Sequence, residues 1–135
     1  MKEQIFINSK DFAGKLVIAS EDENETCGLM IGKGNIVHEI VMMRNEQPSP
    51  VYFAVSAEKA GDIIMYAKSK GLKVIGVFHS HPNNHPQPSA TDHDYMGESW
   101  PLVWTIYSPR YKTWASWRRV GDDIKPVTTV ITETL

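Results

Sequence analysis

The chain has 135 residues, of which 41% are hydrophobic and 22% are charged, and these values predict one globular domain spanning residues 1–135. A formal net charge of −2 gives no reason to expect nucleic acid or an anionic membrane as a partner. The single cysteine, Cys27, excludes an intrachain disulfide, and no apolar run is long enough to span a bilayer. Because the chain also begins without a secretory signal, a soluble cytoplasmic protein is expected.

The N-terminal half predicts one helix and then a β-hairpin. Ser9 can cap the helix, and an apolar face follows at helical spacing, formed by Phe12, Leu16 and Ala19. Runs of apolar residues then predict two strands at 27–31 and 36–43, joined by a glycine-containing turn. A short strand is also expected at 52–54, after a proline-rich loop.

The second half predicts an alternation of helices and strands. The clearest helix begins after the N-cap Ser56 and ends near Gly71, and its inner face is expected to consist of Ala60, Ile63, Ile64 and Ala67. Residues 74–78 are apolar on both faces, which is typical of a buried central strand. A short helix is expected from Ser89, and further strands are expected at 102–107, 114–120 and 124–131. This alternation predicts an α/β fold with helices packed on a mixed sheet.

The most informative segment follows the expected central strand. His79 and His81 are two residues apart on that strand, so their side chains project to the same face. Three prolines within residues 82–88 stiffen the following loop, which can return Asp92 to the same point. Two imidazoles and one carboxylate suit Zn²⁺, with a fourth position left for water. This set predicts a catalytic zinc site, since a structural site would add a fourth protein ligand.

The motif H-x-H-P at residues 79–82, followed by S-x-x-D at residues 89–92, resembles the signature of the JAMM (MPN+) metalloproteases. In that family a glutamate precedes a Cys-Gly pair that opens a strand, and residues 25–29 (ETCGL) are similar to that segment. The resemblance covers roughly residues 5–110 and is to the stand-alone prokaryotic members. It implies an MPN-type α/β fold, similar in arrangement to the cytidine deaminase fold.

The resemblance implies a role for each of five residues. His79, His81 and Asp92 would hold one zinc ion. Glu25 would be the general base that takes a proton from the attacking water and hands it to the leaving amine. Ser89 would donate a hydrogen bond to the tetrahedral oxyanion.

The resemblance also implies the substrate. Members of the family cleave the peptide or isopeptide bond after the diglycine tail of a ubiquitin-like protein or sulfur carrier, and an extended tail could add to an edge formed by residues 48–55. Two other functions stay open, a non-catalytic MPN scaffold and a zinc hydrolase acting on a small-molecule amide. A nucleobase deaminase needs cysteine ligands, and the chain has Cys27 alone. A homodimer also stays open.

The same residues have simpler explanations. Residues 89–92 could form a helix N-cap with an acidic third residue, and this role is compatible with catalysis. Glu25 lies in an acidic stretch and by composition alone would be a solvated charge, while Cys27 would be a small buried apolar residue. His85 and His93 are weaker candidates for contact with metal or substrate.

Overall fold

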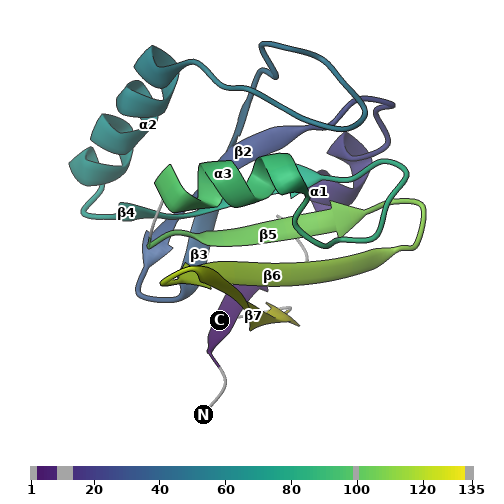
Figure 1. Cartoon of the computed structure of the whole chain (residues 1–135). Helices are drawn as coiled ribbons and strands as arrows, with labels where there is room; N and C mark the ends of the chain where they lie inside the picture. The colour runs from purple at the N-terminus through teal and green to yellow at the C-terminus, as the bar shows by residue number, and fades with distance from the viewer. Residues whose placement is uncertain (1–2, 9–13, 99–100, 133–135) are drawn as a thin grey trace.

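A mixed β-sheet that closes on itself organises the molecule (Figure 1). The computed structural model describes residues 3–8, 14–98 and 101–132. Within them, the strands are β1 (Gln4–Asn8), β2 (Cys27–Lys33), β3 (Ile36–Met43), β4 (Lys73–Ser80), β5 (Val103–Ser108), β6 (Thr113–Val120) and β7 (Asp123–Thr132). Their order in the sheet is β1-β3-β2-β4-β5-β6-β7, and β7 pairs with β1 to close it. Both pairings of β1 and the β4–β5 pairing are parallel, whereas the other pairings are antiparallel.

Helices flank this sheet. In the described part of the chain they are α1 (Gly14–Ala19), α2 (Ala57–Ser69) and α3 (Ala90–Glu98). α2 contacts β2 and β4, and α3 contacts β6. None of these helices has the length and hydropathy that crossing a bilayer requires. The predicted α/β class, with helices on a mixed sheet, is confirmed.

Most strands and helices predicted from the sequence are present, with ends within two residues of those expected. The strand predicted at 52–54 is not present, because the side chain of Asn45 binds this backbone in place of a neighbouring strand. Its Oδ1 accepts from the Ala54 N–H at 3.0 Å, and its Nδ2 donates to the Tyr52 carbonyl at 3.2 Å. The predicted cap Ser9 and the apolar residue Phe12 lie outside the described residues.

The strand β1 is missing from the sequence prediction. Ile5 and Ile7 are buried, whereas Gln4 is exposed and Phe6 is partly exposed, which is the pattern of a strand with one face in the core. The strand is only five residues long, and both its partners, β3 and β7, are distant in sequence. Closure of the sheet therefore depends on long-range pairing that local periodicity does not reveal.

The ends of α2 follow their sequence signals. The Ser56 hydroxyl accepts from the Lys59 N–H at 3.3 Å, and Gly71 takes a φ of +71° directly after the helix. Ala67 is buried as predicted. The prediction is wrong for Ile64, which is 53% exposed because α2 borders an open groove at this point.

Alternate residues of β4 belong to two different clusters of the hydrophobic core. Phe78 packs with Ile5, Ile7 and Met30 in one cluster. Val77 packs with residues of the other cluster, which comprises Cys27, Phe53, Met96 and Trp104. His79 is two residues from Val77 and its ring contacts Phe53 and Trp104, so it lies on the face of β4 that the second cluster covers.

Candidate metal centre

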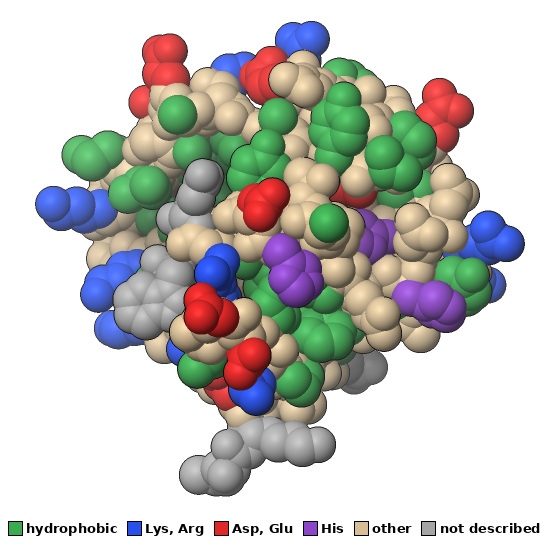
Figure 2. All heavy atoms as spheres, viewed as in Figure 1, with side chains coloured by type: hydrophobic (Ala, Val, Ile, Leu, Met, Phe, Trp, Pro, Cys, Tyr) green, Lys and Arg blue, Asp and Glu red, His purple; other side chains and the backbone are tan. Residues whose placement is uncertain are grey.

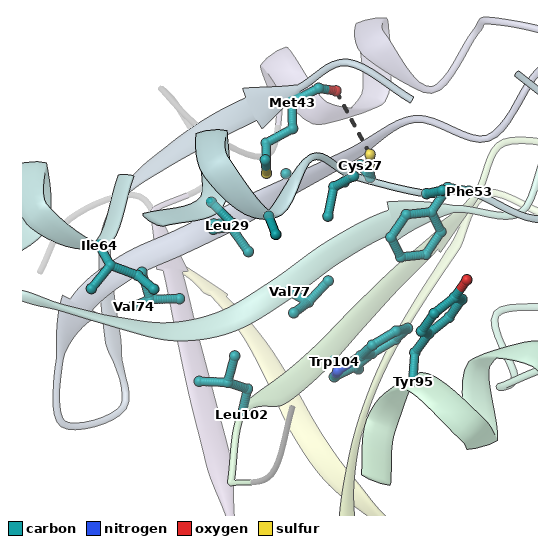
Figure 3. A pocket seen from close by; sticks show the side chains of 15 residues that line it. Cys27, Leu29, Met43, Phe53, Ile64, Val74, Val77, Tyr95, Leu102 and Trp104 are labelled. Carbon is teal, nitrogen blue, oxygen red and sulfur yellow. Dashed lines mark hydrogen bonds between the residues drawn. The ribbon is translucent and has the colours of Figure 1, made fainter. Parts of the chain in front are cut away.

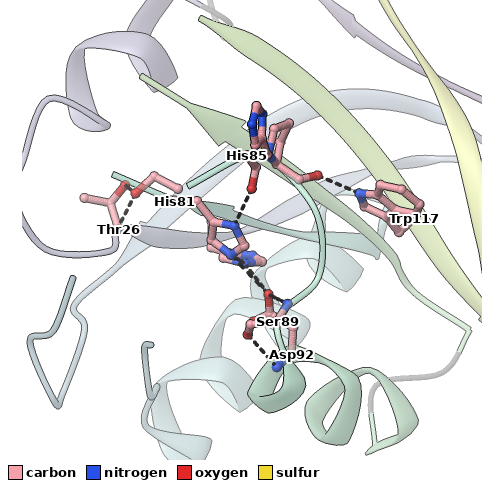
Figure 4. A network of polar contacts seen from close by, with 9 residues as sticks. Thr26, His81, His85, Ser89, Asp92 and Trp117 are labelled. Carbon is pink, nitrogen blue, oxygen red and sulfur yellow. Dashed lines mark hydrogen bonds and ion pairs between the residues drawn. The ribbon is translucent and has the colours of Figure 1, made fainter. Parts of the chain in front are cut away.

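Three side chains of the segment 79–92 converge at one end of the sheet (Figure 4). His79 lies near the end of β4, His81 directly follows this strand, and Asp92 lies in the first turn of α3. The Nε2 atoms of the two histidines are 3.0 Å apart, and each is 3.1 Å from the Asp92 Oδ2 atom. These residues are 0%, 5% and 2% exposed, respectively. The predicted convergence of the three side chains is therefore present, and we call the three atoms the donor triangle.

The donor triangle has the dimensions of a metal site. A cation about 2.0–2.2 Å from each atom would have ligand–metal–ligand angles of about 90–100°, leaving one side open. A further candidate is Glu25, since one oxygen of its carboxylate and a ring nitrogen of each of His79 and His81 lie within 4.8 Å of one another. The Glu25 Oε1 atom is buried and has no hydrogen-bond partner in the described residues. The cluster can therefore hold a divalent cation and keep a carboxylate beside it.

Asp92 is held by the start of α3. Its Oδ2 accepts from the Ser89 N–H at 2.9 Å, and the Ser89 hydroxyl accepts from the Asp92 N–H at 3.1 Å. This reciprocal pair is a capping arrangement, so the simpler explanation of residues 89–92 holds together with the metal-site geometry. As an acceptor in this pair, the Ser89 hydroxyl retains its own O–H for donation to another group.

His81 is oriented by the loop that follows it. Its Nδ1 atom donates to the His85 carbonyl at 2.9 Å, which leaves the Nε2 lone pair for a metal. The loop is fixed in turn by the Trp117 indole N–H, which donates to the Pro86 carbonyl at 2.9 Å (Figure 4). The His85 ring is stacked on Tyr111 with centroids 3.8 Å apart. The contribution of His85 to the cluster is therefore its backbone carbonyl and not its imidazole.

Glu25 is positioned from two directions. The Ser80 hydroxyl accepts from the N–H of the next residue, Thr26, at 2.9 Å. On the other side, the Glu25 N–H donates to the Ser49 carbonyl at 2.7 Å and the Asn45 side chain donates to the Glu25 carbonyl at 3.0 Å. Glu25 is only 3% exposed, so it is not the solvated charge that composition suggests. These supporting residues were not predicted. The signal available in the sequence was a polar residue shortly after a predicted strand, Asn45 after 36–43 and Ser80 after 74–78.

Burial controls the charges of the cluster. It raises the pKa of Glu25 from 4.5 to about 8, with His81 acting in the opposite direction and Asp92 in the same direction. Burial also favours protonation of Asp92, but hydrogen bonds from His79 and His81 outweigh it and hold the Asp92 pKa well below its ordinary value. Asp92 is therefore ionised at neutral pH.

The two histidines share the Asp92 carboxylate but differ in enclosure. Complete burial lowers the pKa of His79 in spite of this hydrogen bond. Burial acts in the same direction on His81, which is nearer the surface, but hydrogen bonds to Asp92 and the His85 carbonyl outweigh it and raise its pKa. His79 therefore has the neutral form that a metal ligand requires.

Two other candidate residues contribute no donor atom to the cluster. Cys27 is buried, its thiol donates to the Met43 carbonyl at 3.6 Å, and burial raises its pKa to about 12. It therefore fits the small apolar role predicted for it. His93 is exposed on α3, and its backbone carbonyl accepts from Arg119 at 3.5 Å.

Two hollows with no shared lining residue flank the donor triangle. The first, which we call the apolar groove, has a volume of about 380 Å³ (Figure 3) and a lining that includes Cys27, Leu29, Phe53, Ile64, Val77, Tyr95 and Trp104. The second, which we call the polar cleft, has a volume of about 300 Å³ and is lined by Glu25, Val51, His81, Asn84, His85, Gln87, Pro88 and Ser89. On the face seen in Figure 2, hydrophobic side chains gather over the segment before α2, close to histidine side chains.

Sequence comparisons identify a family and two relatives. The family described as prokaryotic homologs of the JAB domain matches residues 18–120. A protein named desampylase from Pyrococcus furiosus is 36% identical over 101 residues, which cover 73% of this chain and 71% of the relative. A second desampylase, from Haloferax volcanii, is 30% identical over 118 residues, which cover 84% of this chain and 82% of the relative.

Structural comparisons identify similar folds at low sequence identity. A Desulfitobacterium hafniense protein solved in solution has a TM-score of 0.83 and 23% identity, covering 98% of this chain and 95% of its own. A JAB1/MPN domain protein from Archaeoglobus fulgidus has a TM-score of 0.60 and 18% identity, covering 95% of this chain and 98% of its own. These likenesses concern the fold alone.

Proposed function

The chain belongs to the family of prokaryotic JAB-domain homologues, and we propose that it is a zinc-dependent peptidase or isopeptidase that cleaves after the C-terminal diglycine of a ubiquitin-like or sulfur-carrier protein. The resemblance to the JAMM type, the MPN-type fold and the assignment to metallopeptidase-type hydrolases are confirmed. The likeness to the cytidine deaminase fold stays a prediction. We further propose that residues 1–135 form one catalytic domain. The observation that carries the proposal is the buried donor triangle beside Glu25, whose Oε1 atom has no hydrogen-bond partner among the residues that the structure describes.

In this proposal each residue of the site has one task. His79, His81 and Asp92 hold the zinc ion, which when bound polarises the scissile carbonyl and makes water more acidic. Glu25 accepts a proton from the attacking water and delivers it to the leaving amine. Its pKa of about 8 in the metal-free protein and its buried position support this task. Ser89 donates its O–H to the tetrahedral oxyanion, since its oxygen already accepts from Asp92.

The apolar groove supports a peptide tail as the substrate. It runs from α2 to the donor triangle, where two of its walls, Phe53 and Trp104, contact the His79 ring. A small polar amide would leave most of this apolar surface uncovered, whereas a tail with apolar side chains would bury it. The name desampylase, which both relatives carry, implies a ubiquitin-like protein as their substrate. The complete donor set argues against a non-catalytic scaffold.

The edge predicted at residues 48–55 contains no strand, and within this segment residues 51–55 are the candidate for contact with the tail backbone. The sheet is closed in the described residues, so the tail has no edge strand to join there. The segment itself has no regular structure, with Val51 in the lining of the cleft and Phe53, Ala54 and Val55 in that of the groove. An extended tail along this segment would lead from the groove to Glu25.

Mass spectrometry of a ubiquitin-like protein with a short extension after Gly-Gly tests the proposal. The zinc-loaded protein should cleave after the diglycine, and Glu25→Ala should not. Glu23→Ala, an exposed carboxylate two residues away, is the matched control and should cleave normally. Equal cleavage by Glu25→Ala would refute the base role. A wild-type protein with stoichiometric zinc but no cleavage would move the substrate elsewhere, and one that binds no zinc would favour the scaffold.

A further inference from the structure

The two histidines of the donor triangle differ at their outer nitrogen. The His81 Nδ1 atom donates to the His85 carbonyl at 2.9 Å. The His79 Nδ1 atom is buried and has no hydrogen-bond partner in the described part of the chain. Metal-binding histidines almost always donate this proton to an oxygen, which fixes the tautomer and the orientation of the ring. The orientation of His79 therefore needs another cause.

His81 has a carbonyl acceptor for its outer nitrogen, whereas His79 has aromatic rings around it. The centroid of Phe53 is 4.9 Å from that of His79 at an interplanar angle of 34°, and that of Trp104 is 5.3 Å away at 79°. Phe53 and Trp104 are themselves 5.8 Å apart and lie beside each other at one end of the groove (Figure 3). Ring packing of this kind restricts rotation, and an aromatic face is a weak acceptor for an N–H group.

We propose that Phe53 is a positioning residue for the metal centre. Together with Trp104, it keeps the His79 ring oriented with Nε2 toward the ion. Once the ion replaces the proton that Nε2 shares with Asp92, the remaining ring proton lies on Nδ1. Trp104 lies on a strand that is paired on both sides, so the sheet fixes its position. Phe53 lies on an irregular segment, and its ring completes the packing around His79. The inference rests on the proposed function for the identity of the ion. It adds that a ligand of the metal is fixed by a wall of the substrate groove.

Zinc affinity of the full chain, measured by competition with a chromogenic chelator, tests this role without any substrate. Phe53→Leu should weaken zinc binding by about tenfold to a hundredfold, as loss of an outer partner does at other metal sites. Phe53→Tyr keeps the ring and should bind zinc like the wild type. Phe78→Leu is the matched control, because Phe78 adjoins His79 in sequence but packs in the other core cluster. It should lower the melting temperature and leave zinc affinity unchanged.

Nuclear magnetic resonance of the zinc-loaded wild type provides a readout that does not depend on a variant folding. The His79 Nδ1 proton should resonate upfield of the His81 Nδ1 proton, since an aromatic ring shields it and no oxygen binds it. A His79 proton as far downfield as that of His81, or unchanged zinc affinity in Phe53→Leu, would overturn the inference alone. A wild type that binds no zinc would overturn the proposed function as well.

Discussion

The apolar groove and the polar cleft are both lined by residues on or next to the strands β2 and β4, but the two hollows differ in chemistry. Before β2, Glu25 lines the cleft, and two residues later Cys27 lines the groove. At the end of β4, Val77 lines the groove and His81 lines the cleft. A shift of a few residues along two paired strands therefore changes the surroundings from aliphatic and aromatic to ionisable, with the donor triangle at the boundary.

This difference separates two tasks. The groove offers a surface that gains free energy when apolar groups cover it, which suits recognition of a tail without charge. The cleft contains Glu25, which can transfer a proton, and Ser89, which can stabilise a negative charge, so it suits the chemical step. In the proposed reaction, the tail lies in the groove and the leaving amine lies in the cleft.

Loss of a ligand from the donor triangle, which lies between the two hollows, should have the largest effect on zinc binding and cleavage. Asp92→Ala deletes one corner of the donor triangle and leaves two buried histidines without their carboxylate. Zinc content should fall to background, and cleavage should fall on the order of a thousandfold or more, because several kcal/mol of charge stabilisation are lost. Atomic absorption and the cleavage rate measure the two effects. Asp94→Ala, an exposed residue of the same helix, should change neither.

The burial of Glu25 in the cleft should also be measurable, as a pH dependence of the stability of the metal-free protein. The Glu25 pKa of about 8 in the folded protein lies above its ordinary value of 4.5, so the folded state binds more protons between these pH values. The stability of the metal-free protein should therefore fall as pH rises from about 4.5 to about 8. Glu25→Gln should remove this part of the pH dependence and raise the free energy of unfolding at pH 8 by on the order of a few kcal/mol.

Thermal unfolding across this pH range, with a chelator present, measures the difference between the two proteins. Glu23→Gln removes a carboxylate of the same acidic stretch that is exposed, and should retain the wild-type profile. A Glu25→Gln protein that loses stability in parallel with the wild type would mean that the carboxylate is solvated, and that the cleft does not differ from ordinary surface.

The groove can be tested with two neighbouring residues of α2. Ile64 is 53% exposed and lines the groove, whereas Met65 is 64% exposed and lies outside it. Ile64→Lys should raise the KM for a diglycine-tailed protein by about tenfold, the effect of losing part of an apolar contact. Met65→Lys adds the same charge to the same helix and should leave KM near the wild-type value. Similar changes in both variants would assign the effect to charge and not to the groove.

The sequence predicts the local part of the site well. His79 and His81 share a face because a strand has a period of two, and Ser89 meets Asp92 because a helix start brings such residues together. Glu25 is different, since composition favours a solvated charge and only the family resemblance selects it. Its burial depends on hydrogen bonds that join Glu25 and its neighbour Thr26 to residues 20 and 54 positions later in the chain, respectively, which no local pattern encodes.

The same distinction applies to the fold. Strands β2 to β7 and the helix α2 are predicted because each has its own apolar pattern and end signals. The closure of the sheet is not, because β1 is short and pairs with β7 at the other end of the chain. The α2 side of the groove is also missed, since Ile64 fits the inner stripe of a helix and only its neighbours in space leave it exposed.

The smallest expected effect concerns the leaving side of the reaction. Gln87 lines the cleft and is exposed, so Gln87→Lys should favour an acidic over a basic extension after the diglycine by about two- to fivefold, the range of an exposed charge pair. The preference should weaken as salt is added. Gln47→Lys, exposed outside the cleft, should show none, and Ile64→Lys should slow both extensions equally. If Ile64→Lys instead changed the ratio, the leaving segment would contact the groove, and the division between the two hollows would be wrong.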